Sequence, residues 1–81
     1  MAAAKNTLQL LGEELRACRQ AAALSQDSLA AKAGLHRNFI GMIERGERNL
    51  TILTLEAIAD VLDISMADVL RAVEKRQRGS R

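Results

Sequence analysis

Apolar residues recur at steps of three and four along most of the chain, in five blocks separated by short polar or glycine-containing segments. That spacing puts the apolar side chains on one face of a helix, whereas a half-buried strand would alternate at every second position. The first block runs from residue 7 to about 23, and the others begin near residues 26, 37, 52 and 66. The pattern therefore predicts an all-α protein of five helices.

Residues that favour helix ends stand between these blocks. Gly34 closes the second block and Gly46 the third, because glycine readily adopts the left-handed conformation that follows many helices. Polar residues able to cap a helix start precede the blocks: Asn6 or Thr7, Ser25, His36, Thr51, and Ser65 with Asp68 three residues later. Two short helices joined at Gly34 predict a helix-turn-helix within residues 24–51.

The third predicted helix carries polar side chains on the face opposite Ile40 and Ile43. A helix that enters the DNA major groove needs hydrogen-bonding side chains near its N-terminus and an anchored opposite face. Arg37 can bond both acceptors on a guanine edge, Asn38 can pair with adenine, and Gly41 lets the backbone approach the bases closely. The candidate base-reading residues are Arg37, Asn38, Gly41 and Met42, of which Met42 can touch a thymine methyl.

Phosphates are usually bound where backbone amides point outward, at the starts of helices. Gln26 and Thr51 stand at the starts of the second and fourth predicted helices and so flank the reading helix. His36 is either a cap or a phosphate neighbour, since it has no partners for catalysis or metal binding. The candidate phosphate-binding residues are therefore Gln26, His36, Arg45, Arg48, Asn49 and Thr51.

Composition and charge narrow this interpretation. With 81 residues, 48% of them hydrophobic, one aromatic and no proline, the chain is a single small helical domain without room for a deep substrate cavity. We expect one domain over residues 1–81, with an ordered core at about 6–74 and a fraying basic tail at 75–81. The net charge of +2 divides into +1, +1, −4 and +4 over residues 1–24, 25–50, 51–70 and 71–81. The acidic segment should face away from a polyanion, whereas the basic tail either touches phosphate or is simply solvated.

Enzymatic, metal-binding and membrane functions find little support in the sequence. The lone cysteine, Cys18, lies on the apolar face of the first helix, and we expect a small core residue there, with a redox switch as the alternative. No Cys or His cluster has metal-ligand spacing, no apolar run approaches membrane length, and no nucleophile has a base beside it. We expect a cytoplasmic protein that is not an enzyme and has no cofactor, membrane association or small-molecule substrate.

Residues 11–70 resemble a known family. The string LSQ, LA, AGL, R, I, IERGERN, T, TL, IA, L is similar to helix-turn-helix regulators of the Xre or lambdoid-repressor type, and RNFIGMIERGERNLTILTLEAI is similar to the controller proteins of restriction-modification systems. The resemblance implies a compact five-helix bundle of the lambda-repressor type and a homodimer that binds double-stranded operators upstream of its own gene and the endonuclease gene. A phage-type repressor or an antitoxin of the same fold is the nearest alternative, and a protein-interaction module is an alternative of another class.

The resemblance also implies roles for single residues. It adds Thr54 to the phosphate contacts, and it implies a largely buried ion pair between Arg19 and Glu44 that ties the first helix to the third. Where controller proteins often carry Asp, Tyr and Ser in the reading helix, this chain has His36, Phe39 and Gly41. The operator sequence therefore does not transfer with the family.

The fifth predicted helix bears on assembly. Its apolar stripe is too wide for a short terminal helix to bury against its own core, so we expect Met66, Val69 and Val73 at a dimer interface and Leu70 in the core. A two-fold dimer would place two reading helices about 34 Å apart, which is one turn of B-DNA. The sequence therefore predicts a near-palindromic operator.

Overall fold

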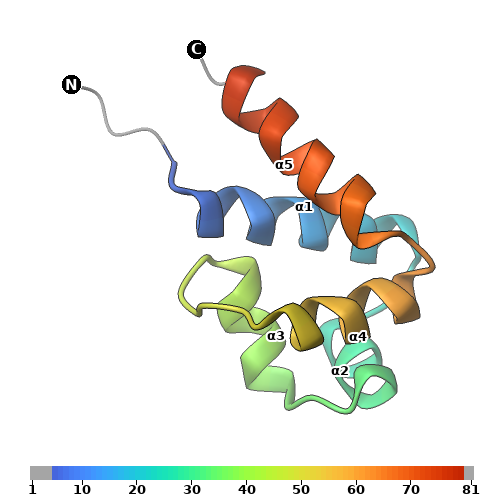
Figure 1. Ribbon diagram of the computed structural model, residues 1–81. Coiled ribbons are helices and arrows are strands. Elements are labelled where there is room, and N and C mark those ends of the chain that lie inside the picture. The colour runs from blue at the N-terminus through green and yellow to red at the C-terminus, as the bar shows by residue number, and fades with distance from the viewer. Residues whose placement is uncertain (1–4, 80–81) are drawn as a thin grey trace.

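In a computed structural model, which describes residues 5–79, the chain folds into five helices (Figure 1). They are α1 (Thr7–Ala21), α2 (Gln26–Ala33), α3 (Arg37–Glu44), α4 (Ile52–Leu62) and α5 (Met66–Gly79). The described residues contain no strand, and none of their helices is long and apolar enough to cross a membrane. The prediction of an all-α, five-helix protein is confirmed.

Polar side chains cap the helix starts, as the sequence predicted. Asn6 Oδ1 accepts from the Gln9 amide at 2.9 Å, and Gln9 Oε1 accepts from the Asn6 amide at 2.9 Å, which completes a reciprocal capping box. Ser65 Oγ accepts from the Asp68 amide at 2.9 Å, but the Asp68 carboxylate pairs with Arg71 at 2.6 Å instead of closing a second box. The caps at Ser25, His36 and Thr51 are confirmed.

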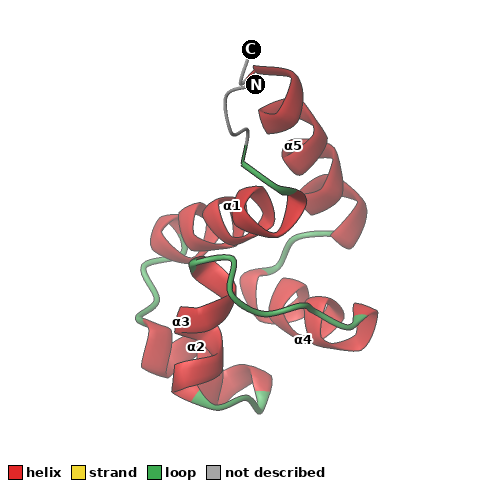
Figure 2. Ribbon diagram, turned by 90° about the vertical axis from the view of Figure 1, so that its left-hand side faces the viewer, coloured by secondary structure: helices red, strands yellow, loops and turns green. Residues whose placement is uncertain are grey.

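One hydrophobic core joins all five helices. Figure 2 shows α1 lying between α5 and the pair formed by α2 and α3. Burying each Leu or Ile side chain contributes about 1.5 to 3 kcal/mol relative to leaving it exposed, so this core stabilises the packing of α2 and α3 against the other helices. Its members are Leu10, Leu11, Leu15, Leu29, Ala30, Ile40, Ile43, Leu55, Ile58, Leu62, Val69 and Val73.

α5 continues past the residue where we expected it to end. The predicted ordered core stopped at residue 74, whereas the helix reaches Gly79. Arg76 Nε lies 2.9 Å from Glu14 Oε1, and Arg76 Nη1 lies 3.4 Å from Glu13 Oε1, both on α1. These ion pairs tie the last turns of α5 to α1, so the helix extends beyond the expected end of the ordered core, and fraying of the basic tail stays a prediction. Residues 80 and 81 of that tail, and residues 1–4 of the predicted domain, lie outside the described residues.

α5 also turns a different face to the core than we expected. Val69 and Val73 are 2% and 3% exposed and belong to the core of the single chain, with Met66 packed at its edge. Leu70, expected in the core, is 43% exposed. The assignment of Val69 and Val73 to a dimer interface and of Leu70 to the core is therefore wrong, because packing against α1 fixes the rotation of α5 about its own axis.

Candidate nucleic-acid interface

α3 is held against α1 at a close approach that requires glycine. A Cβ atom on Gly12 of α1 would stand 2.4 Å from the carbonyl oxygen of Ile43 and 2.6 Å from that of Glu44. The sequence prediction missed this role of Gly12. A signal did exist, since glycine inside a helix costs about 1 kcal/mol relative to alanine and usually has a packing reason.

Glu44, the last residue of α3, joins three helices through its carboxylate. Arg19 Nε donates to Glu44 Oε2 at 2.6 Å, Arg19 Nη2 donates to Oε1 at 3.1 Å, and Gln26 Nε2 donates to Oε1 at 3.0 Å. The Arg19 and Glu44 side chains are 11% and 4% exposed, and the hydrogen bond that Arg19 donates to Glu44 raises the pKa of Arg19. Arg19 Nη1 also donates to the Leu24 carbonyl at 2.8 Å. The buried ion pair that the resemblance implied is thus confirmed, and it fixes the end of α3 relative to α1 and α2.

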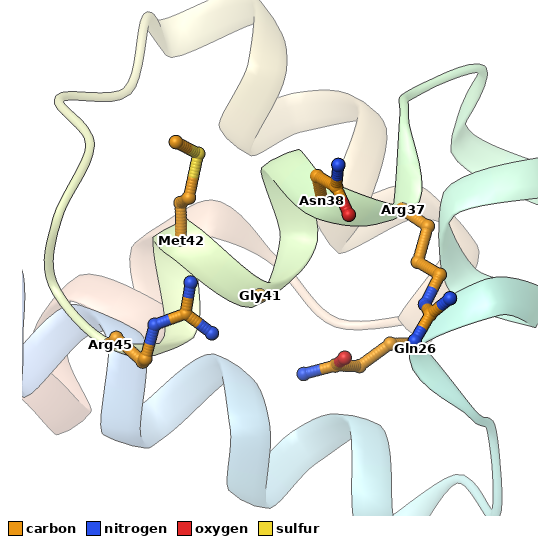
Figure 3. A pocket seen from close by; sticks show the side chains of 6 residues that line it. All are labelled: Gln26, Arg37, Asn38, Gly41, Met42 and Arg45. Atoms are coloured by element: carbon orange, nitrogen blue, oxygen red, sulfur yellow. The ribbon is translucent and has the colours of Figure 1, made fainter.

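Several predicted contact residues line one groove of about 290 Å³ between the start of α2 and the outer face of α3 (Figure 3). In Figure 3, Arg37 extends from the start of α3 toward Gln26, and the Arg45 guanidinium approaches Gly41 from the other end of α3. The four candidate base-reading residues therefore share one surface with two of the candidate phosphate-binding residues. The lining consists of Gln26, Arg37, Asn38, Gly41, Met42 and Arg45.

Gly41 does not present an open backbone. It is buried, and Arg45 Nη1 lies 3.1 Å from the position that a Cβ atom on Gly41 would take. Close approach of the Gly41 backbone to DNA stays a prediction, and in this structure the Arg45 guanidinium covers that backbone. Close approach there requires movement of Arg45, whose Nε lies 3.1 Å from Glu47 Oε2.

The remaining candidate phosphate contacts lie outside the lining of the groove. His36 Nδ1 accepts from the Asn38 amide at 3.2 Å, which confirms the capping alternative for this histidine. The Arg48 guanidinium lies over the half-buried Phe39 ring, 5.2 Å from its centroid, in a cation–π contact. Contact with phosphate stays a prediction for all five of these residues: His36, Arg48, Asn49, Thr51 and Thr54.

Two carboxylates that the sequence prediction did not include face the arginines of the groove. Asp27 Oδ1 lies 3.0 Å from Arg37 Nε, and Glu47 Oε2 lies 3.1 Å from Arg45 Nε. The sequence signal for Asp27 was ambiguous, because an acidic residue in the first turn of a helix is already explained by the helix dipole. Its pairing with Arg37 depends on the turn that brings two helices together.

The basic end of α5 is remote from the groove. In both Figure 1 and Figure 2 the last turns of α5 lie on the side of the molecule away from α2 and α3. The basic tail was expected either to touch phosphate or to be simply solvated. For residues 75–79 this position favours the solvated alternative.

Cys18 is half-buried on α1, and its thiol donates to Glu14 Oε2 at 3.3 Å. Burial raises the pKa of Cys18 to about 11, and the hydrogen bond and charge of Glu14 add to the effect. A thiol that stays protonated at neutral pH is a poor redox sensor, so the structure favours the packing role over the switch. Among residues 5–79, no group of three or more His, Cys, Asp or Glu side chains could hold a metal ion.

We expect Cys18 to react slowly with iodoacetamide in the folded protein. Its thiolate fraction at pH 8 should be roughly a hundredfold below that of an ordinary thiol of pKa 9.0, because each pKa unit is a factor of ten. Since the folded pKa exceeds the unfolded one, this thiol contributes stability below pH 9 that is lost as the pH rises toward 11. Mass spectrometry of alkylation between pH 7 and 11 measures the effect, and equal rates for native and urea-unfolded chains at pH 8 would contradict it.

Known proteins resemble this chain in sequence and in fold. Residues 15–69 match a family model described as helix-turn-helix. The control protein C.SmaI of Serratia marcescens is 44% identical over 62 residues, which span 76% of this chain and 74% of that protein. The crystal structure of the restriction-modification controller protein C.AhdI from Aeromonas hydrophila has a TM-score of 0.75 at 39% identity, covering 76% of this chain and 94% of that one. The controller protein C.Esp1396I, solved as a tetramer with its natural 35 base-pair operator, has a TM-score of 0.81 at 31% identity, covering 91% of this chain and 97% of that one.

Proposed function

This chain belongs to the helix-turn-helix family, as the controller proteins compared above do, and from that membership we propose that it is a transcriptional regulator that binds duplex DNA sequence-specifically as a homodimer. Its proposed role is that of a restriction-modification controller acting on its own gene and on the endonuclease gene. The family consists of transcriptional regulators, and we propose binding in the cytoplasm without cofactor or catalysis. The observation that carries the proposal is the groove lined by Arg37, Asn38 and Met42 of α3 beside Gln26 of α2.

The packing of α3 suits it for the DNA major groove. Ile40 and Ile43 are 1% and 3% exposed, so they anchor one face, while Arg37 and Asn38 are exposed at the N-terminal end. An α-helix with its side chains is about 10 to 12 Å across, which fits the width of the major groove. Gln26 Nε2 donates one hydrogen to Glu44. Its second Nε2 hydrogen and the backbone amide of Gln26 are suited to bind a DNA phosphate at the edge of the major groove.

Sequence identity favours the controller type over the nearest alternatives. The control protein C.SmaI is 44% identical to this chain over 74% of its own length. A phage-type repressor or an antitoxin of the same fold would instead be distinguished by its gene neighbourhood. Adjacent endonuclease and methyltransferase genes would support the controller assignment, and an adjacent toxin gene would overturn it.

We propose that a second copy of the chain covers the exposed apolar residues of α4 and α5. Ile52, Leu53 and Leu70 are 61%, 71% and 43% exposed, and we propose them for the interface in place of Val69 and Val73 of the expected stripe of Met66, Val69 and Val73. Large exposed aliphatic side chains of this kind are typical of surfaces buried by association. A two-fold arrangement would set the two copies of α3 about 34 Å apart on one face of the duplex.

Selection of bound duplexes from a random pool by the purified chain tests the proposed function. We expect enrichment of two inverted half-sites with centres about 10 base pairs apart or at a multiple of that spacing. Binding should weaken steeply as salt is added, because neutralised phosphates release counterions. A chain that enriches no sequence and shows no salt-dependent duplex binding would overturn the proposal and favour the protein-interaction module.

Arginines in the two proposed roles should respond differently to substitution. Arg37→Ala should cost about 1 to 3 kcal/mol on the selected duplex and relax the preference at one base position, because a bidentate guanine contact is lost. Arg48→Ala should weaken selected and random duplexes alike and lower the salt slope by about one, as expected for a phosphate contact. Titrations of both duplexes at several salt concentrations measure this, and identical behaviour of the two variants would contradict the assigned roles.

A further inference from the structure

We propose that Asp27 is a positioning residue that orients Arg37 toward the base it reads and thereby sets the sequence preference of the protein. The inference rests on the proposed function and adds to it a carboxylate from the neighbouring helix. Two observations support this role: the ion pair between Asp27 and Arg37, and the position of that pair between two hollows of the surface.

The ion pair joins the first turn of α2 to the start of α3. Asp27 is the second residue of α2 and Arg37 the first of α3, and Asp27 Oδ1 lies 3.0 Å from Arg37 Nε. Both side chains line a second hollow of about 270 Å³ at the start of α2, whereas Arg37 also lines the larger groove. The Arg37 guanidinium therefore lies at the boundary between its carboxylate partner and the reading surface.

The position of Asp27 leaves the reading edge of Arg37 available. A guanidinium has five N–H donors in a fixed plane, and the contact of Asp27 Oδ1 with Arg37 Nε is an ion pair that engages none of these donors in a hydrogen bond. The parallel donors on Nη1 and Nη2 form the fork that fits the O6 and N7 acceptors of guanine. An arginine without a partner must give up many side-chain conformations when it binds, and the ion pair restricts those conformations beforehand.

The same carboxylate disfavours contacts that are not specific. A negative charge beside Arg37 repels nearby phosphates and lowers the gain from a simple Arg37 to phosphate contact. Exposed ion pairs contribute little to folding stability, and these two side chains are 67% and 69% exposed, so stability does not account for the pair. Asp27 should therefore favour the right base and oppose random DNA at the same time.

The chain offers a matched control in Asp68. Like Asp27, Asp68 stands in the first turn of a helix, is 70% exposed and pairs with an arginine, here Arg71 at 2.6 Å. It lies on α5, which contributes no residue to either hollow. Asp68→Asn thus removes the same charge from a similar setting without touching the reading surface.

The test measures binding of the selected duplex and of a scrambled duplex by the full chain and its variants. With Asp27→Asn, we expect about two- to tenfold weaker binding of the selected duplex, the loss from immobilising one long side chain. Binding of the scrambled duplex should tighten, with a salt slope steeper by up to about one. Asp68→Asn should leave the ratio of the two affinities unchanged, and Asp27→Glu should recover part of it.

A double-mutant cycle with Arg37→Ala separates positioning from simple charge repulsion. In the Arg37→Ala background, Asp27→Asn should no longer change the ratio of selected to scrambled affinity, because the group that it orients is gone. If Asp27→Asn strengthens both duplexes equally, or behaves as Asp68→Asn does, the positioning role is overturned while the proposed function stands. If the wild-type chain prefers no duplex at all, the proposed function fails, and the role of Asp27 fails with it.

Discussion

Replacing Glu44 with alanine is expected to lower the free energy of unfolding by about 3 to 5 kcal/mol. The Arg19 side chain is 11% exposed in the parent structure, and the substitution removes the carboxylate that accepts two of its hydrogen bonds. It also removes the acceptor of Gln26 Nε2, so the contact between α2 and α3 loosens together with that between α1 and α3. Urea denaturation followed by circular dichroism measures the loss as a lower midpoint at an unchanged slope.

Glu47→Ala is the matched control for this loss. Glu47 pairs with Arg45 through the same kind of carboxylate and guanidinium contact, at 3.1 Å, but the two side chains are 52% and 59% exposed. Exposed pairs are screened by water, so this substitution should cost at most about 1 kcal/mol. Equal losses for the two variants would show that burial does not set the strength of the Arg19 to Glu44 contact.

Gly12→Ala is expected to destabilise the fold by about 3 kcal/mol, the upper end of the range for overpacked cores, or to prevent folding. The added methyl group would meet the carbonyl oxygens of Ile43 and Glu44 at 2.4 and 2.6 Å, and a backbone cannot move aside as a flexible side chain can. Relief of the clash would push α1 and α3 apart and lengthen the Arg19 to Glu44 contact. Thermal unfolding measures the loss of stability. Circular dichroism shows how much of the parent's helix content the variant keeps.

Gly79→Ala provides the comparison, because a Cβ atom on Gly79 of α5 would meet nothing within 4 Å. Alanine is the better helix former by up to about 1 kcal/mol, so this variant should be as stable as the parent or slightly more so. A Gly12→Ala protein of unchanged stability would mean that α1 and α3 can separate at little cost.

Local features of the sequence predicted most of the fold. Side-chain caps such as those of Ser25 and Thr51 act within three residues, so the sequence alone contains both partners of each interaction. Within each block the apolar residues likewise recur at steps of three and four. That spacing is enough to predict five helices and their approximate ends. Base-facing positions followed from the same period, because the face opposite the anchors Ile40 and Ile43 must be the outer one.

Features that depend on distant residues were not predicted. The rotation of α5 depends on its contact with α1, and the Arg76 to Glu14 bond joins residues 62 positions apart. The covering of Gly41 by Arg45 and the ion pair of Arg37 with Asp27 depend on side-chain conformations that no spacing rule contains. The Arg19 to Glu44 pair, 25 positions apart, was anticipated only through the family resemblance.

The interleaving of anchors and reading residues in α3 determines how readily this protein can change its target sequence during evolution. Arg37 and Asn38 are exposed, and exposed substitutions usually alter stability by less than about 0.5 kcal/mol, so single mutations there can redirect recognition while the fold survives. At Gly41 a Cβ atom would lie 3.1 Å from Arg45 Nη1, which is the end of a flexible and exposed side chain that can shift by the few tenths of an ångström required. Descendants of this chain should therefore diversify freely at residues 37 and 38, and should accept a small side chain at residue 41 without a change at residue 45.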